Sequence, residues 1–179
     1  MIIEKLIGDV IAKEGGYSHH SADRGGPTRW GVTQAVAQRH GYRGDMRHFP
    51  YRDAVAIYRI QYWLRPGFDK IAEHAPSLAA ELFDTGVNMG PAVATGFLQR
   101  ALNALNRNGA DFHDLATDRK IGTQTIAALQ QFLRKRGTNG EAVLRKAVDA
   151  LQGERYITLT ETRPRNEAFL YGWLANRIA

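Results

Sequence analysis

Residues 3–16 read IEKLIGDVIAKEGG, and their apolar positions recur at intervals of three and four. These positions are Ile3, Leu6, Ile7, Val10 and Ile11. The spacing predicts a helix with one apolar face turned to the core. The next position of that face is Glu14, directly before the breaker pair Gly15-Gly16. We therefore expect Glu14 to end the helix and to point inward.

A glutamate in this position is suited to acid catalysis. The C-terminal end of a helix is the negative end of its dipole, and burial removes water from the carboxylate, so both effects favour the protonated acid. A glycosidase needs such an acid to protonate the leaving oxygen. Taken alone, a glutamate at a helix end is more often simply solvated. The residues that follow favour the catalytic interpretation.

Composition narrows the class of protein. The chain has 179 residues, 44% of them apolar, and no cysteine, so we expect one compact domain or two small lobes without disulfides. No apolar run approaches the roughly 20 residues of a membrane span, and the charged N-terminal helix does not resemble a signal peptide. We therefore expect a monomer, made in the cytoplasm without a signal peptide and without stable membrane insertion. Action on the cell wall or periplasm then requires release by a separate, holin-like export route.

Positive charge is concentrated in the second half of the chain. The net charge is +6; residues 1–90 carry 11 Lys and Arg against 10 Asp and Glu, and residues 91–179 carry 13 against 8. The excess suits a polyanion such as nucleic acid, an anionic membrane or the carboxylate-rich cell wall, or it is a solvated face without a partner. Nucleic acid is disfavoured because the basic residues are scattered rather than clustered on one helix.

Helical spacing continues to the C-terminus and predicts an all-α protein of seven or eight helices. Residues 15–32 are rich in glycine and have no apolar period, so they predict a loop or a minor β-hairpin near residues 17–31. Later helices are expected over 33–40, 51–64, 76–89, 93–106, 126–136 and 144–160, with a last one around Phe169 to Leu174.

The glycine-rich loop supplies two partners for Glu14. Asp23 follows it by nine residues and Thr28 by fourteen, so a loop that returns past the helix end brings both side chains near it. Glycoside hydrolysis needs an acid on one side of the bond and a carboxylate, or a group that holds water, on the other. We therefore assign catalysis to Glu14 as acid, with Asp23 opposite and the Thr28 hydroxyl orienting water. Taken alone, Asp23 is more often a turn residue.

This loop also carries a family signature. The motif of glycoside hydrolase family 108, the phage endolysin muramidases and their relatives in bacterial protein-release systems, resembles two strings of this chain. They are Glu14-Gly15-Gly16-Tyr17 and Ala22-Asp23-x-Gly25-Gly26-x-Thr28-x-Trp30-Gly31-Val32-Thr33. The resemblance implies a lysozyme-like helical body, peptidoglycan as substrate, no cofactor, and the role of catalytic acid for Glu14. The order Glu, Asp, Thr is also similar to the catalytic trio of other phage lysozymes.

The second half resembles the predicted peptidoglycan-binding domain that accompanies this family. The pattern is carried by Phe83-Asp84-x-x-Val87-Asn88-Met89-Gly90-Pro91, by Phe97-Leu98-Gln99-Arg100-Ala101-Leu102-Asn103, and by Asp118-x-x-Ile121-Gly122-x-x-Thr125. The resemblance implies a muramidase region at residues 1–90 and a peptidoglycan-binding-like helical region at residues 91–179. Because no long linker separates the regions, we expect one continuous body.

Two positions differ from the family pattern. Members often have Asn-Asp-Pro-Ala-Asp where this chain has HHSAD at residues 19–23, so His20 replaces a second acidic residue. Arg24 replaces the usual proline after Asp23. The acidic role therefore falls on Asp23. Adjacent histidines rarely converge on one ion, so we expect no metal at His19 and His20.

Four residues are candidates for substrate binding. Tyr17 and Trp30 flank the acid motif and are suited either to stack on a sugar ring or to pack in the core. Asp84 and Asn88 lie one helical turn apart, so they share a face. They either bind sugar N-acetyl and hydroxyl groups or fasten the two halves of the chain together. Tyr58, Tyr62 and Trp63 of the helix expected over 51–64 are expected in the core rather than on a sugar-binding surface.

The favoured function is hydrolysis of the β-1,4 bond between N-acetylmuramic acid and N-acetylglucosamine, with Glu14 as general acid. One alternative is a lytic transglycosylase, in which a hydroxyl of the sugar replaces water. Another is a non-catalytic protein that binds the cell wall or nucleic acid. Loss of peptidoglycan cleavage in Glu14→Gln separates an enzyme from a binding protein.

Overall fold

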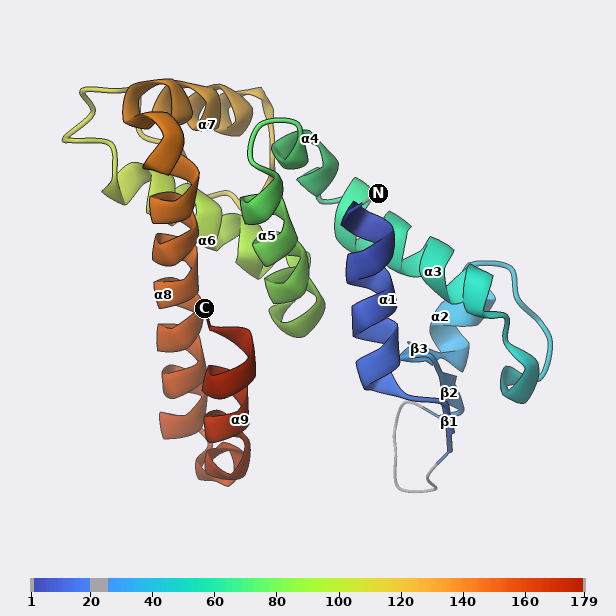
Figure 1. The fold of residues 1–179 in the computed structure, drawn as a ribbon. Coiled ribbons are helices and arrows are strands. Elements are labelled where there is room, and N and C mark those ends of the chain that lie inside the picture. The colour runs from blue at the N-terminus through green and yellow to red at the C-terminus, as the bar shows by residue number, and fades with distance from the viewer. Residues whose placement is uncertain (1, 20–25, 179) are drawn as a thin grey trace. The chain divides into compact units, whose positions relative to one another are not determined.

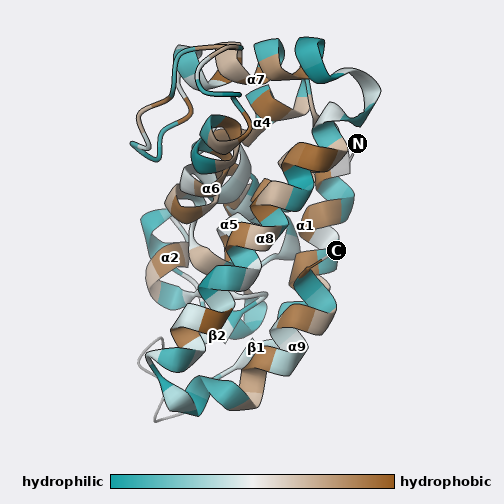
Figure 2. Cartoon of the chain, turned by 90° about the vertical axis from the view of Figure 1, so that its left-hand side faces the viewer, coloured by the Kyte–Doolittle hydropathy of each residue, from teal (hydrophilic) through white to brown (hydrophobic). Residues whose placement is uncertain are grey.

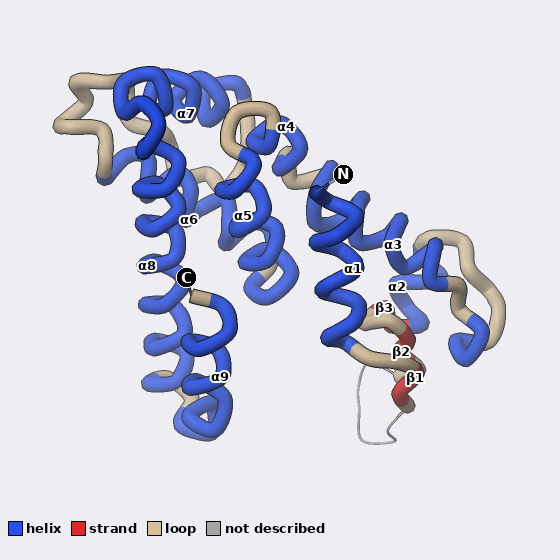
Figure 3. The backbone as a smooth tube through the Cα atoms, in the orientation of Figure 1, coloured by secondary structure: helices blue, strands red, loops and turns tan. Residues whose placement is uncertain are grey.

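The structure is a computed structural model that describes residues 2–19 and 26–178, and it divides into two compact units, Met1–Trp63 and Leu64–Ala179. Helices dominate both units, and the strands of the described residues are confined to one small sheet (Figures 1 and 3). The predicted all-α class with a minor β element is therefore confirmed. Among these residues, none of the helices combines the length and the apolar character needed to cross a membrane.

The first unit begins with the predicted amphipathic helix. Its elements are α1 (Ile2–Glu14), β1 (Tyr17–Ser18), β2 (Thr28–Arg29), β3 (Val32–Thr33), α2 (Gln34–Arg39), a 3₁₀ turn (Met46–His48), α3 (Tyr51–Arg59) and a π-helical turn (Ile60–Leu64). The apolar face of α1 is buried as its spacing predicts: Ile3, Ile7, Val10 and Ile11 each expose less than a tenth of their surface. This face is what ties α1 to the core of the unit.

The predicted hairpin is a three-stranded antiparallel sheet in the order β1-β2-β3. Tyr17 pairs with Arg29, and Thr28 pairs with Thr33. Thr33 then caps α2, because its side chain accepts a hydrogen bond from the backbone amide of Val36 at 3.4 Å. The sheet therefore connects the end of α1 to the start of α2.

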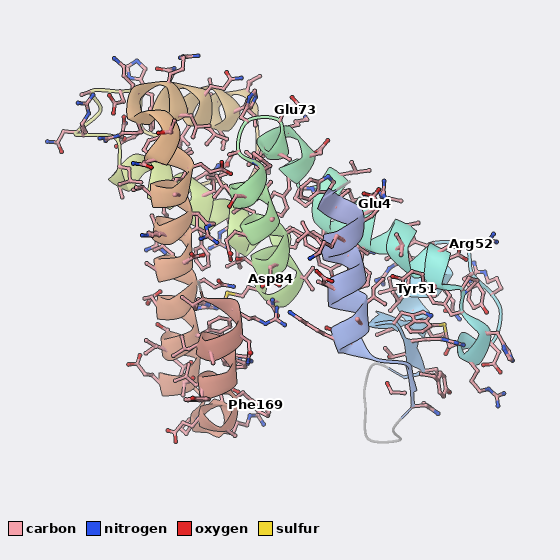
Figure 4. All side chains as sticks on the ribbon, in the orientation of Figure 1. Glu4, Tyr51, Arg52, Glu73, Asp84 and Phe169 are labelled. Atoms are coloured by element: carbon pink, nitrogen blue, oxygen red, sulfur yellow. The ribbon has the colours of Figure 1, made fainter. Side chains whose placement is uncertain are left out.

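The helix expected over 51–64 changes type partway along. It is α-helical to Arg59 and continues as a π-helical turn from Ile60, which shifts the direction of the side chains that follow. Arg59 pairs with Glu4 of α1 at 2.5 Å. That contact, together with the buried face of α1, holds α1 against α3 (Glu4 is labelled in Figure 4).

The second unit consists of helices. They are α4 (Phe68–Ala72), α5 (Pro76–Met89), α6 (Pro91–Ala104), α7 (Thr123–Arg136), α8 (Gly140–Glu161) and α9 (Glu167–Arg177), with 3₁₀ turns at Gly137–Asn139 and Pro164–Asn166. Pro76 and Pro91 occupy first-turn positions, where a missing amide hydrogen costs nothing. The sequence did not predict α4, because five residues are too few to show a helical period.

The core of this unit lies between α5, α6 and α8. Leu78 and Leu82 of α5, Leu98 and Leu102 of α6, and Leu144 of α8 are fully buried, and the apolar residues appear as brown segments along these helices in Figure 2. The N-terminus of α5 is capped by a side chain of α8. The carboxylate of Glu141 accepts hydrogen bonds from the backbone amides of Ser77 at 2.6 Å and Leu78 at 3.0 Å.

The segment between α6 and α7 has little regular structure and is held by side-chain amides of α6. Asn103 exchanges two hydrogen bonds of 2.8 Å with the backbone of Leu115. Asn106, which is fully buried, bonds the backbone of Phe112 in the same way at 2.6 and 3.0 Å. Gln99 binds the segment further along, at Asp118, Arg119 and Lys120. The three amides together replace the backbone pairing that a helix or strand would provide.

Candidate functional site

Glu14 is the last residue of α1, and its side chain is exposed. The expectation that it points inward is therefore wrong, although the four apolar positions before it are buried. The reason is that the helix ends at this residue and the chain leaves through Gly15 in a left-handed conformation, with φ of 78°. Among the residues that the structure describes, no further helical turn covers the carboxyl group. It remains open to an incoming substrate.

Gly31 brings the backbone of the sheet against Glu14. Its φ of 72° is one that residues with a side chain rarely adopt. A Cβ atom at Gly31 would lie 3.0 Å from Cγ of Glu14 and would collide with the Tyr58 hydroxyl. The turn between β2 and β3, the end of α1 and the ring of Tyr58 on α3 therefore meet at one place.

Two tyrosines, Tyr58 of α3 and Tyr62 of the π-helical turn that follows it, lie near this carboxyl group. Tyr58 is buried and Tyr62 is half-buried, and their ring centroids are 5.5 Å apart. Burial raises the pKa of both hydroxyls, and the negative charge of Glu14 raises each further. Both therefore stay protonated at any physiological pH and are available as hydrogen-bond donors beside Glu14.

Sequence reasoning placed these tyrosines in the core and did not connect them with the acid. The available signal was their spacing of four, which puts two phenol hydroxyls on one face of a predicted helix. What the sequence lacked was the packing partner of that face. Contact between α1 and α3 is a long-range feature that helical periodicity does not specify.

Thr28 lies on β2 and is half-buried. Its hydroxyl donates a hydrogen bond to the carbonyl oxygen of Gly26 at 3.1 Å, which leaves the oxygen lone pairs as acceptors. Asp23, the other predicted partner of Glu14, lies outside the residues that the structure describes, as do His20 and Arg24.

The two aromatic candidates have different surroundings. Tyr17 on β1 is 42% exposed. The indole nitrogen of Trp30 donates to the carbonyl oxygen of Phe49 at 3.3 Å, and its ring packs edge-on against Tyr51 at 5.6 Å. The Arg29 guanidinium lies 5.1 Å from the same ring. Trp30 therefore contacts three residues of its own unit, Phe49, Tyr51 and Arg29 (Tyr51 is labelled in Figure 4).

Asp84 and Asn88 lie on α5 of the second unit. The carboxylate of Asp84 pairs with Arg177 of α9 at 3.0 and 3.1 Å. The Asn88 amide donates to the backbone carbonyl of Asp84 at 2.8 Å and to its carboxylate at 3.2 Å. The pair with Arg177 joins residues from the two halves of the sequence within this unit (Asp84 is labelled in Figure 4).

The second unit also contains two carboxyl groups that sequence reasoning missed. Burial raises the pKa of Glu81 to about 7, and the charges of Asp149 and Asp84 add to the shift. Asp149 on α8 is 2% exposed, and burial raises its pKa as well. The Thr85 hydroxyl donates to Glu81 at 3.3 Å. The signal in the sequence was the position of Glu81 on the apolar face of α5, between Leu78 and Leu82.

Two further features bear on ligands. A cavity of about 370 Å³ in the first unit lies between α2 and α3 and is lined by residues such as His40, Tyr42 and Ile57, not by Glu14. Among the residues described, no group of three or more histidine, aspartate or glutamate side chains is arranged to hold a metal ion.

A helix that ends in an accessible glutamate beside a small sheet suits glycosidic bond cleavage, and the chain is a glycoside hydrolase. Residues 7–90 match the family model described as Glycosyl hydrolase 108. Residues 93–178 match the model described as Predicted Peptidoglycan domain. The combination of the two identifies a peptidoglycan hydrolase.

A solved structure supports the fold. The chain is similar to the protein in "Structure of Brucella abortus SagA", with a TM-score of 0.64 and 22% sequence identity over 97% of this chain and 88% of that one. At this level of identity the similarity concerns the fold alone. No curated protein matches the chain in sequence.

Proposed function

We propose that the protein is an N-acetylmuramidase that hydrolyses the β-1,4 bond between N-acetylmuramic acid and N-acetylglucosamine, with Glu14 as the general acid. The observation that carries the proposal is the accessible carboxyl group of Glu14 at the end of α1, bordered by Gly31 and by the Tyr58 hydroxyl. Glu14 protonates the bridging oxygen as the glycosidic bond breaks, and positive charge develops on the sugar ring.

The second half of the reaction needs water on the opposite face of the sugar. We assign Asp23 to stabilising the developing charge or activating that water, and Thr28 to orienting it. The assignment of Thr28 is supported by its hydrogen bond to Gly26, because the hydroxyl hydrogen is already used and the oxygen accepts a hydrogen from water. No cofactor is needed for these steps.

The aromatic and polar candidates receive separate roles. Tyr17, with its exposed ring, stacks on a sugar. Trp30 shapes the turn that carries Gly31, since its indole is held by Phe49 and Tyr51. Asp84 holds α9 on α5 through Arg177, and Asn88 donates a hydrogen bond to Asp84, which favours fastening over sugar binding for these two residues.

The products of digestion test the reaction. Attack by water gives fragments with a free reducing end on N-acetylmuramic acid. Attack by the sugar's own hydroxyl, as in a lytic transglycosylase, gives a 1,6-anhydro ring that is lighter by one water. We expect reducing-end products in mass spectra of purified peptidoglycan digested by the full chain. Predominantly anhydro products would contradict hydrolysis but retain Glu14 as acid, and cleavage of peptide bonds alone would contradict both.

The route to the substrate follows from the same proposal. We propose that the enzyme acts as a monomer on the cell wall after release by a separate, holin-like export route. Expression in the cytoplasm, with and without a membrane-permeabilising protein, tests this step. Lysis that occurs only when the membrane is permeabilised supports the proposed route, and lysis without permeabilisation contradicts it.

A further inference from the structure

Three arginines line one cavity of the second unit. The cavity has a volume of about 290 Å³ and lies between α6, the segment before α7, and α8. Arg100 comes from α6, Arg119 from the segment and Arg155 from α8. We call this cavity, with the three arginines and its apolar residues Val93 and Phe97, the arginine pocket.

The charges of the arginine pocket are not neutralised within the described chain. None of the described residues forms an ion pair with Arg100, Arg119 or Arg155. Glu154 also lines the pocket, and its carboxylate accepts a hydrogen bond from Thr158 at 2.8 Å. Three positive groups against one negative group leave a positive excess in a small volume, which attracts an anion.

The fold fixes the backbone from which the exposed Arg119 side chain extends. Its φ of 64° lies in the left-handed region, which residues other than glycine rarely adopt. Gln99, which is buried, holds it there by accepting a hydrogen bond from the Arg119 amide at 2.9 Å. The same side chain donates to Asp118 at 2.8 Å and to the Lys120 carbonyl at 3.1 Å.

A glycine on α6 makes room for the Arg119 side chain. A Cβ atom at Gly96 would lie 3.4 Å from Cγ and 3.8 Å from Nε of Arg119, so this side chain lies across the bare backbone of the helix. Unusual backbone geometry that is maintained by a buried amide is typical of sites where a side chain must be held in place. Two of the sequence motifs of this half, around Gln99 and Asp118, therefore meet to fix the backbone of one arginine.

We infer that the arginine pocket binds the free carboxylates of the peptide stems of peptidoglycan, an inference that rests on the proposed function. Arginine binds carboxylates through paired hydrogen bonds, and arginines on three different elements can hold more than one carboxylate of the same peptide. Phe97 is 6% exposed and Val93 is half-buried, so they provide an apolar floor for the methyl and methylene groups of the stem.

Peptide binding by the wild-type protein is the first test. The full chain is titrated calorimetrically, at low salt, with the tripeptide L-Ala-γ-D-Glu-meso-diaminopimelate and with the same peptide after amidation of its carboxyl groups. We expect the amidated peptide to bind at least about tenfold more weakly, because the charge-assisted hydrogen bonds are lost. Equal binding of both peptides, or binding of neither, would overturn the inference.

Variants then locate the binding site. The double variant Arg100→Gln, Arg155→Gln keeps the side-chain length and removes two charges, and we expect about tenfold weaker binding of the free peptide. Arg165→Gln removes an exposed charge of the same unit outside the pocket and is expected to bind as the wild type does. An unchanged affinity in the double variant, with its circular dichroism spectrum intact, would place the peptide elsewhere.

A third measurement separates this inference from the proposed function. On glycan strands whose stem peptides have been removed, the double variant is expected to cleave at the wild-type rate. On intact peptidoglycan it is expected to be slower at low substrate. Failure of the wild type to cleave any glycan would refute the proposed function but leave the peptide titration as an independent result. A single-stranded oligonucleotide that displaces the peptide would assign the arginines to nucleic acid instead.

Discussion

The two units differ in the solvent exposure of the carboxyl groups discussed above. In the first unit, Glu14 is exposed at a helix end, and two protonated tyrosines lie near it. In the second, Glu81 and Asp149 are withdrawn from solvent, and burial raises their pKa. A raised pKa is often taken as a sign of catalysis. Here the strongest shift to a near-neutral value belongs to Glu81, which lies in the second unit but within the residues that match the Glycosyl hydrolase 108 model, while the proposed acid is the accessible one.

Removal of the exposed acid is expected to have the largest effect. Glu14→Gln keeps the shape of the side chain but cannot donate the proton, so peptidoglycan cleavage should fall on the order of 100-fold or more. Because Glu14 is exposed and ends its helix, the melting temperature should stay nearly unchanged. The measurement is the rate of release of reducing ends, and more than about a tenth of the wild-type rate would refute the role of acid.

Replacement of the buried acid is expected to change stability rather than turnover. The pKa of Glu81 rises from 4.5 to about 7 on folding, so the folded state binds more protons than the unfolded state between these values. The free energy of unfolding therefore falls as pH rises from 4.5 to 7, by up to about 3 kcal/mol. In Glu81→Gln this loss should be absent, which makes the variant more stable than the wild type at pH 8.

Urea unfolding at pH 4.5 and pH 8 measures the difference, and Glu73→Gln, a change at an exposed glutamate labelled in Figure 4, is the control. The control should follow the wild type at both pH values. If Glu81→Gln did so too, Glu81 would be ionised in the folded state without cost. That result would remove the contrast between the two units.

A third change tests the close approach beside Glu14. Gly31→Ala places a Cβ atom against Tyr58 and Glu14 and also strains the left-handed backbone, so we expect a loss of about 2 kcal/mol of stability and a marked fall in activity. Gly41→Ala is the matched control, because φ is 91° but nothing lies within 4 Å of its Cβ position. It should cost only about 1 kcal/mol and leave turnover unchanged. Equal losses in the two variants would mean that strain alone is responsible.

The smallest effect is expected at the ion pair on α9. Arg177→Gln breaks a partly buried pair with Asp84, whose side chains are 22% and 29% exposed, and should lower the free energy of unfolding by about 1 kcal/mol. Arg52→Gln removes an arginine that is 89% exposed and lies 3.5 Å from Asp53, and should have no measurable effect. A large increase in KM for peptidoglycan in Arg177→Gln, without a stability change, would indicate that Asp84 takes part in substrate binding.

Much of the fold was predictable because it depends on local rules. Amphipathic spacing located α1, first-turn prolines located the starts of α5 and α6, and Thr33 marked the start of α2. The predictions failed where tertiary contacts or very short elements determine the structure. The inward direction expected for Glu14 assumed another covered turn, yet the helix ends there, and five residues of α4 were too few to show a period.

The candidate site was predictable to a similar degree. Motif and spacing proposed Glu14 and Thr28 as site residues, but the approach of Gly31 to Tyr58 depends on how α3 packs against α1. The buried position of Glu81 could be suspected from the apolar face of α5, whereas its interaction with Asp149 required the pairing of α5 with α8. Contacts between distant helices are what periodicity leaves open.

The amides of Gln99, Asn103 and Asn106 have a consequence for how this protein can change over evolutionary time. Each of them bonds a particular backbone group between residues 112 and 120, so the length of chain between these anchors is set by the helix. An insertion between two of these bonded residues would move the backbone groups on one side of it away from their side-chain amides on the helix. Length variation among natural variants should therefore concentrate at the exposed tip from Asn108 to Ala110, before the first anchored residue.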